Sequence, residues 1–131
     1  TREELRTTPG SGSDVMRDLL KGVTDAEIAA LAKHFSALPA RPPEAAKDEA
    51  LFRAGEMLAA KHHCGSCHLP NYHGQEQMPR LAGQREEFLL EAMLQYRANR
   101  RPGGDTMMAA ALHGIPEEGI RALAHFLARL P

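Results

Sequence analysis

The sequence has no tryptophan, only four phenylalanines and two tyrosines, and no apolar run as long as a membrane span. Its 16 Lys and Arg residues are balanced by 17 Asp and Glu residues, and a net charge of −1 does not favour a nucleic-acid partner. With so few large aromatic side chains, the 131 residues are short of core material. We expect one domain, or one domain with an appendage, and a cofactor would supply the missing apolar bulk.

Cysteine is scarce as well, and the two cysteines stand together in Cys64-Gly65-Ser66-Cys67-His68. A zinc ribbon needs four soft ligands, and the chain has no third cysteine. A disulfide or thiol redox pair needs no following histidine, and the strand-helix-strand pattern typical of such redox proteins is absent. The spacing instead predicts one covalently attached haem c, with the Cys64 and Cys67 thiols bonded to its vinyl groups and His68 bound to its iron.

Apolar residues recur at helical spacing in three segments, and no pair of strands is indicated. We predict helices over residues 49–63, 85–98 and 117–129. The segments 69–84 and 99–105 are rich in Pro, Gly, Asn or Gln and predict loops. The pattern predicts an all-α domain wrapped around a flat cofactor.

An electron-transfer haem usually has a second axial ligand, and methionine raises the reduction potential relative to a second histidine. The methionines of the haem-bearing part are Met57, Met78, Met93, Met107 and Met108. Met57 and Met93 lie within predicted helices, where methionine usually fills the core. Met107 and Met108 follow the Gly-rich loop, and we expect one of them to reach the iron, with Met78 as a weaker candidate.

Residues 44–131 resemble a class I cytochrome c, and most closely the second haem domain of the tandem di-haem bacterial cytochromes of the c-four type. The resemblance covers about two thirds of the chain and lies in Gly55, Cys64–His68, Pro79–Gln84, Tyr96-Arg97, Met107-Met108 and Ile120–Phe126. It implies the class I cytochrome c fold, with helices around one haem and an extra helical segment at the N-terminus.

The same resemblance implies roles for several loop residues. Pro79 supports His68 through its backbone carbonyl, and Leu81 and Gln84 line the haem pocket near the propionates. Tyr96 belongs to the haem-binding residues as well.

The resemblance also implies how the helices meet and which sulfur binds the iron. Gly55 would allow the first and last helices to cross closely, with Phe126 packing nearby. Counting back from Ile115 favours Met108 as the axial ligand, and Met107 is the alternative if the register differs by one residue.

The first 43 residues contain an internal repeat of the end of the chain. A shift of 92 positions aligns residues 15–39 with residues 107–131 without a gap, and nine pairs are identical where chance gives about two. The pairs include Met16 with Met108, and a capping box at Thr24–Glu27 opens the copied helix. We predict a partial, haem-less cytochrome-like repeat and Pro-rich linker over residues 1–43, followed by a mono-haem domain over residues 44–131.

Three accounts of the partial repeat stay open: a first haem unit that was lost, a processed fragment, or a unit completed by a partner. Met16 is a former ligand in the first account, whereas in the third it would ligate a haem carried elsewhere. The plainer alternative is two unrelated amphipathic helices of similar composition. The segment has few large side chains to bury, so we expect it to dock on the haem domain or on another chain.

The leading functional hypothesis is electron transfer, by a periplasmic carrier or by the cytochrome subunit of an oxidoreductase, with redox proteins as partners. An iron held by His68 and a methionine has no open position for a substrate, so we expect an electron-transfer protein and no enzyme. A haem enzyme or ligand-binding haem sensor would need an exchangeable sixth ligand, and nothing in the sequence supplies the distal acid-base group of such an enzyme, although His113 near the Met loop can be tested for that role. The start at Thr1 rather than Met predicts a processed chain. In the systems that this motif resembles, covalent haem is attached outside the bacterial cytoplasm, which implies an exported, periplasmic protein whose signal peptide is not in this sequence.

The other histidines and the arginines near the second loop receive no assigned chemistry. A surface or haem-edge position is expected for His62, His63, His73 and His113. Positions on packed helices are expected for His34 and His125. For Arg97, Arg100 and Arg101 two readings stay open, a solvated cluster or partners for the propionates or an acidic protein.

Overall fold

The computed structural model describes residues 18–39, 46–101 and 106–131. The chain divides into two compact units, unit 1 (Thr1–Pro39) and unit 2 (Ala40–Pro131). The boundary predicted at residue 43 lies outside the described residues, as do Met16 and linker residues 40–43.

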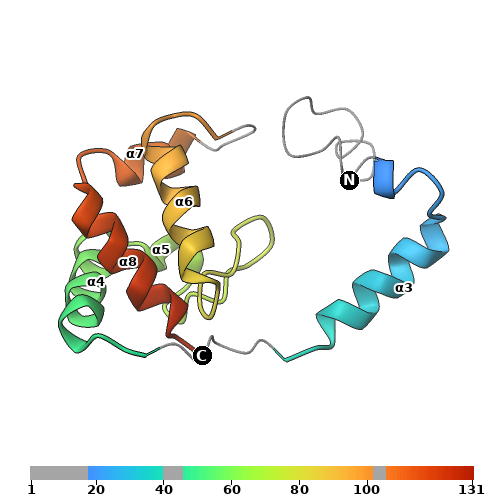
Figure 1. Cartoon of the computed structure of the whole chain (residues 1–131), viewed down its shortest axis with the longest axis horizontal. Helices are drawn as coiled ribbons and strands as arrows, with labels where there is room; N and C mark the ends of the chain where they lie inside the picture. The colour runs from blue at the N-terminus through green and yellow to red at the C-terminus, as the bar shows by residue number, and fades with distance from the viewer. Residues whose placement is uncertain (1–17, 40–45, 102–105) are drawn as a thin grey trace. The chain divides into compact units, whose positions relative to one another are not determined.

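The regular elements in the described part of unit 2 are helices, joined by turns and loops (Figure 1). Its helices are α4 (Glu49–Lys61), α5 (Gly65–His68), α6 (Glu86–Arg97), α7 (Thr106–Leu112) and α8 (Glu117–Ala128). Three of them, α4, α6 and α8, confirm the predicted helices to within two residues at each end. No strand occurs among the described residues, where Gln75 and Met78 form only an isolated bridge, so the all-α class is confirmed.

The short helix α7 was not predicted from the sequence. Its seven residues, TMMAAAL, are mostly good helix formers, but they span too few turns to show an apolar period. Gly114 follows the helix with φ of 77°, a conformation that favours glycine and turns the chain toward α8. Met107 and Met108 therefore lie on a helix, not in the loop that precedes it.

Helices α4 and α8 pack against each other across Gly55. A Cβ atom at this position would lie 2.6 Å from Phe126 Cβ and closer still to the carbonyl oxygen of Ala122. The two backbones approach so closely that only glycine fits. The close crossing of the first and last helices of the haem-bearing part, with Phe126 beside it, is confirmed.

The core of unit 2 is centred on α8. Ile120 and Leu123 are essentially fully buried. Phe126 meets Phe52 and Tyr72 edge to face, with ring centroids 5.1 and 5.6 Å apart. Because α4 and α6 both pack on α8, this helix has little contact with solvent.

The two methionines predicted to fill the core differ in the structure. Met93 is 5% exposed, so that prediction is confirmed. Met57 is 72% exposed, and the prediction for it is wrong. Its position is turned away from α8, since the buried residues of α4 are Gly55 and Ala59.

Backbone hydrogen bonds fix the loop between α5 and α6 against itself and against α8. The carbonyl oxygen of Tyr72 accepts from the amides of Leu81 and Ala82 at 2.9 and 3.0 Å. The amide of Gly83 donates to the carbonyl of Leu127 on α8 at 3.1 Å. The segment Pro79–Gln84 is therefore tied both to the preceding loop and to the core helix.

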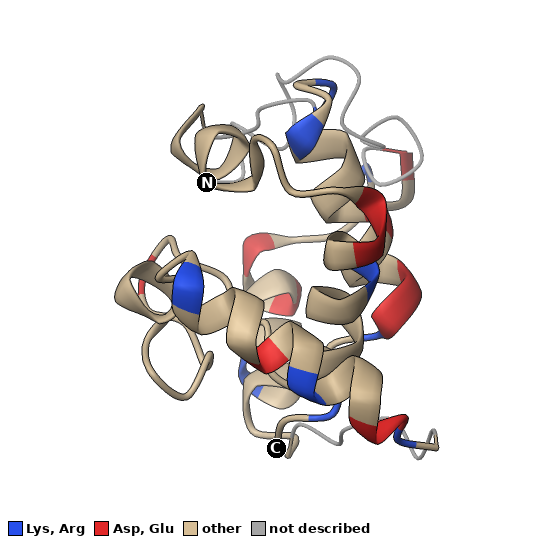
Figure 2. Ribbon diagram, turned by 90° about the vertical axis from the view of Figure 1, so that its left-hand side faces the viewer, with Lys and Arg blue, Asp and Glu red and all other residues tan. Residues whose placement is uncertain are grey.

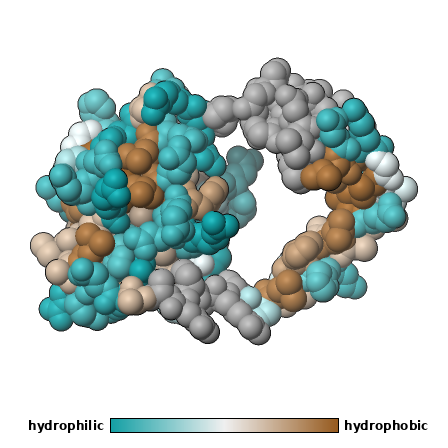
Figure 3. All heavy atoms as spheres, viewed as in Figure 1, coloured by the Kyte–Doolittle hydropathy of each residue, from teal (hydrophilic) through white to brown (hydrophobic). Residues whose placement is uncertain are grey.

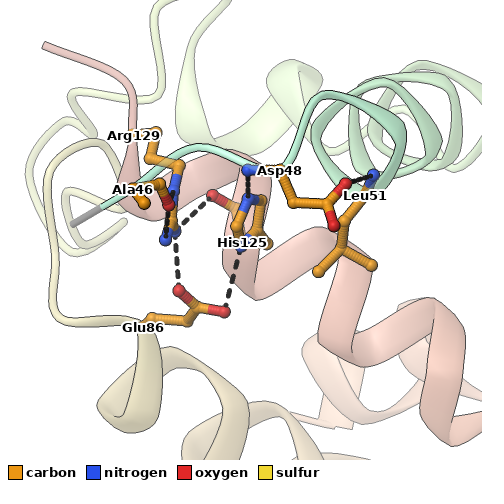
Figure 4. A network of polar contacts seen from close by, with 6 residues as sticks. All are labelled: Ala46, Asp48, Leu51, Glu86, His125 and Arg129. Atoms are coloured by element: carbon orange, nitrogen blue, oxygen red, sulfur yellow. Dashed lines mark hydrogen bonds and ion pairs between the residues drawn. The ribbon is translucent and has the colours of Figure 1, made fainter.

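A buried polar network joins three helix ends in unit 2, as Figure 4 shows. The Asp48 amide donates to Nε2 of His125 at 3.1 Å, and Nδ1 of His125 lies 3.2 Å from Glu86. Arg129 donates to the other carboxylate oxygen of Glu86 at 2.6 Å and to the carbonyl of Ala46. His125 thus links the segment before α4 to α6 and α8.

In unit 1 the described helix is α3 (Asp25–Ser36), and its predicted capping box is confirmed. The Glu27 amide donates to Thr24 Oγ1, and the Thr24 amide donates to the Glu27 carboxylate. The bounds of α3 and α8 differ by the same 92 residues at both ends. The turns before the two helices share a backbone hydrogen bond. The amide of Val23 donates to the carbonyl of Leu20, and the equivalent amide of Ile115 donates to the carbonyl of Leu112, both at 3.2 Å.

Although α3 copies the bounds of α8, it buries none of its residues. Leu31, Phe35 and Leu38 are about half or more exposed, at 49%, 64% and 51%. Figure 3 shows the apolar residues gathered along the length of this helix. His34 lies on this helix and is exposed within unit 1.

Charges of both signs are interspersed along the helices of the described part, as Figure 2 shows. Some described ion pairs join near neighbours in the chain, such as Arg121 with Glu117 on the exposed face of α8, whereas Arg129 with Glu86 joins two different helix ends. None of the described helices is long and apolar enough to cross a membrane.

Candidate haem site

The residues of the haem motif lie on and beside the single-turn helix α5. Cys64 is its N-cap, and Cys67 and His68 belong to the turn. Cys64 is half-buried and packs against the core, Cys67 is exposed, and both thiols are free. His68 is buried, with 7% of its surface exposed.

The imidazole of His68 is held by the loop that follows it. Its Nδ1 lies 2.9 Å from the carbonyl oxygen of Pro79, which is the contact that the family resemblance implies. The carbonyl can only accept, so Nδ1 carries the proton and donates. Nε2 is then the free lone pair, and it has no hydrogen-bond partner among the described residues.

Burial raises the pKa of the Cys64 thiol, and the nearby Cys67 adds to this effect. A backbone hydrogen bond acts in the opposite direction without reversing it. In the apoprotein the Cys64 thiol is therefore mainly protonated near neutral pH.

The three further predicted pocket residues have different environments. Leu81 and Tyr96 are half-buried and pack against the core cluster from the edge. Gln84 is exposed, and its backbone amide donates to the carbonyl of Leu81 at 3.2 Å.

The two candidate sulfur ligands are separated clearly by their exposure. Met107 is 75% exposed, whereas Met108 is partly buried and packs against the core cluster. Leu112, one helical turn further along α7, is 2% exposed and lies on the same face as Met108. Met108 thus occupies the face of α7 that is turned toward the core.

Two of the three arginines near the second loop have partners in the protein. Nη1 of Arg97 donates to the carbonyl of Ile115 at 2.9 Å. The Arg101 guanidinium lies over the Tyr96 ring at 5.1 Å and near the Phe88 ring at 5.9 Å. For Arg97, whose guanidinium binds a backbone carbonyl, the reading as a solvated residue is therefore wrong.

Sequence reasoning missed two polar arrangements around the site. His125 stands on the apolar face of the last helix, and a polar residue in that stripe would have been a signal for a buried network. The bond from Arg97 to a carbonyl eighteen residues away leaves no signal in the sequence.

The other histidines form no metal site. No group of three or more His, Cys, Asp or Glu residues in the described part of the chain is placed to hold a metal ion. Nε2 of His73 lies 2.9 Å from the carbonyl of Pro131, and His113 is exposed.

A hollow of about 470 Å³ lies elsewhere on unit 2. Its walls include Phe52, Tyr72 and Phe126, and none of the predicted haem-binding residues lines it. It is therefore separate from the haem site.

The donor set and its surroundings fit haem c. Two free thiols lie three residues apart beside the buried His68, whose Nε2 is unpartnered among the described residues. Apolar side chains of Leu81, Leu94 and Tyr96 are only partly covered and offer surface for a large flat group.

Residues 52–131 match the cytochrome c family, so the chain belongs to that family and carries haem c attached through Cys64 and Cys67. Within the family it is similar to cytochrome c4 of Stutzerimonas stutzeri, with 29% identity over 136 residues. The match covers 92% of this chain and 65% of that protein, so this chain spans less than two thirds of its relative.

Solved structures give the same assignment of the fold. Cytochrome c4 of Acidithiobacillus ferrooxidans superimposes with a TM-score of 0.74 at 20% identity, over 98% of this chain and 79% of that one. A thiosulfate dehydrogenase of Marichromatium purpuratum superimposes with a TM-score of 0.66 at 28% identity, over 99% of this chain and 29% of that one. The class I cytochrome c fold is confirmed.

Proposed function

We propose that the protein transfers single electrons between redox proteins, with an iron held by His68 and Met108. The observation that carries this proposal is the pairing of a buried His68, fixed through Nδ1, with Met108 on the core-facing side of α7. Haem c supplies an iron that changes its charge by one unit without making or breaking bonds in the protein.

The protein residues act by positioning the groups that would hold the iron. The carbonyl oxygen of Pro79 accepts a hydrogen bond from Nδ1 of His68, which would leave Nε2 to hold the iron and would strengthen the imidazole as a ligand. A thioether at the second position favours the ferrous state and raises the potential. If His68 and Met108 both hold the iron, it would have no coordination site free for a substrate.

The place of this reaction in the cell is part of the proposal. Haem attachment through a Cys pair and the similarity to bacterial cytochromes c4 support a periplasmic protein. The similarity to a thiosulfate dehydrogenase supports the use of the same unit as the cytochrome part of an oxidoreductase. The electron donor and acceptor are then proteins that reach the haem edge.

We further propose that residues 1–43 are a partial cytochrome-like repeat and residues 44–131 the mono-haem domain. The equal bounds of α3 and α8 and the shared turn before them support a common origin. The exposed apolar face of α3 supports association with a helix that covers it as α4 covers α8. The covering helix would come from the haem domain or from another chain.

Substitution of the methionines tests the ligand assignment. We expect the native holoprotein to show one haem by intact mass and a sulfur-to-iron charge-transfer band when oxidised. Met108→Ala should abolish the band and lower the potential, whereas Met107→Ala, the matched control, should keep both. A mass without haem would contradict haem attachment. Loss of the band in Met107→Ala would show that Met107, and not Met108, is the ligand.

Carbon monoxide separates the electron carrier from a haem enzyme or sensor. The reduced native protein should not bind carbon monoxide at neutral pH because its sixth position is occupied. Binding comparable to that of Met108→Ala would contradict the carrier function.

A further inference from the structure

The side chain of Arg97 is anchored inside the protein, although arginine at the end of a helix usually extends into water. It is the last residue of α6 and is only partly exposed. Its Nη1 donates to the carbonyl oxygen of Ile115 at 2.9 Å. Ile115 itself is 3% exposed, so this charge-assisted hydrogen bond lies at the edge of the core.

The carbonyl that Arg97 binds needs a partner from outside its own segment. It lies in the turn between α7 and α8, just after Gly114. The first hydrogen bond of α8 runs from Ile120 to the carbonyl of Pro116, so the Ile115 carbonyl falls outside the ladder of that helix. An unpaired buried carbonyl is costly, and Arg97 satisfies it.

This bond lies at the end of the helix that carries Met108. Helix α7 has only seven residues and packs against α6. Its C-terminal end is held by the buried Leu112 and, three residues further, by the bond between Arg97 and Ile115. A helix this short gains little stability from its own hydrogen bonds, so its placement depends on such contacts.

We infer that Arg97 is a positioning residue for the axial sulfur: by tying α6 to the turn after α7, it holds Met108 at the distance at which it binds the iron. The inference rests on the proposed ligation by Met108. It assigns Arg97 to the protein side of the site, in place of a role as a partner of the propionates.

Competition by an external ligand measures how firmly the sulfur is held. Imidazole is titrated into the oxidised holoprotein, and loss of the sulfur-to-iron band reports displacement of Met108. Arg97→Met keeps the length and apolar stem of the side chain but removes its donors. We expect it to bind imidazole about tenfold more tightly than the native protein, the change that loss of one charge-assisted hydrogen bond produces.

Two further variants make the result specific. Arg97→Lys keeps a donor and a charge and should give an intermediate affinity for imidazole. If Arg97→Met does not fold, Arg97→Lys takes its place as the test variant. Arg121→Met removes an exposed arginine of α8 whose only described partner is Glu117, and it should bind imidazole as the native protein does. Hydrogen exchange should be faster at the amides of the turn, residues 113–115, in Arg97→Met only.

The outcomes separate this inference from the ligand assignment. A native protein with the sulfur band and an Arg97→Met variant with unchanged imidazole affinity would overturn the role of Arg97 and leave Met108 as ligand. A shifted potential with native imidazole affinity would also overturn it, because Arg97 would then act through its charge at the haem. A native protein without the band would refute Met108 and the inference together.

Discussion

At the scale of single residues, Gly55 decides how closely α4 and α8 approach. A helix interior normally disfavours glycine by about 1 kcal/mol relative to alanine. Here a methyl group would meet the backbone of Ala122 and the Cβ of Phe126. Backbone atoms of a packed helix cannot move aside without cost, so the steric effect outweighs the helix propensity.

We expect Gly55→Ala to lower the free energy of unfolding by about 2 kcal/mol, the difference between about 3 kcal/mol of overpacking and about 1 kcal/mol of helix propensity. Urea unfolding of the oxidised holoprotein measures the change. Ala54→Ser, which adds one atom on the exposed side of the same helix, should change stability by less than about 0.5 kcal/mol. Equal stability of native protein and Gly55→Ala would show that the helices can separate at no cost.

At the scale of helices and loops, Glu86 joins three elements through His125 and Arg129. Partial burial raises the pKa of the Glu86 carboxyl, but hydrogen bonds from Arg129 and His125, together with the positive charge of Arg129, outweigh it and hold the pKa below its ordinary value. A carboxyl whose pKa is lower in the folded state stabilises the fold above its unfolded pKa. That contribution is lost as the pH falls through the folded pKa.

We therefore expect the native protein to lose stability on acidification below about pH 4.5, and Glu86→Gln to lose less over the same range. At neutral pH Glu86→Gln should be less stable by up to about 1 kcal/mol, because the carboxylate is partly exposed. Urea unfolding at a series of pH values measures both effects. Glu87→Gln, the exposed neighbour in the same helical turn, is the control and should follow the native curve. Parallel curves for native and Glu86→Gln proteins would rule out this role for Glu86.

At the scale of the whole molecule, the two units differ in the burial of equivalent apolar residues. In α8 these residues are covered by α4 and α6, whereas their copy in α3 is exposed at Leu31, Phe35 and Leu38. Exposed apolar faces of this kind favour association, since covering them removes apolar surface from water.

We expect the holoprotein to associate with itself as its concentration rises, and the double variant Leu31→Glu, Phe35→Glu to stay at the mass of a single chain. Light scattering coupled to size exclusion measures the mass. The double variant Ala26→Glu, Ala29→Glu adds the same charge on another face of α3 and should associate like the native protein. A native protein that stays at single-chain mass would exclude association between copies through this face.

Local sequence signals were enough to predict the parts of the fold that depend on neighbours in the chain. The periodic apolar residues of α4, α6 and α8 predicted those helices, and Thr24 and Glu27 predicted the start of α3. Seven residues were too few to predict α7, because a single pair of turns carries no distinct period.

The haem attachment of this protein was determined by its sequence alone, since two thiols at fixed spacing and the adjacent His68 lie within five consecutive residues. Tertiary structure decided what depends on distant contacts: which methionine faces the core, where Arg97 finds its acceptor, and that His125 is buried in a polar network. These contacts form between residues far apart in the chain, so their energies depend on packing that no local pattern encodes. The motif determines the cofactor, and the packing of α6, α7 and α8 determines where Met108 and Arg97 lie.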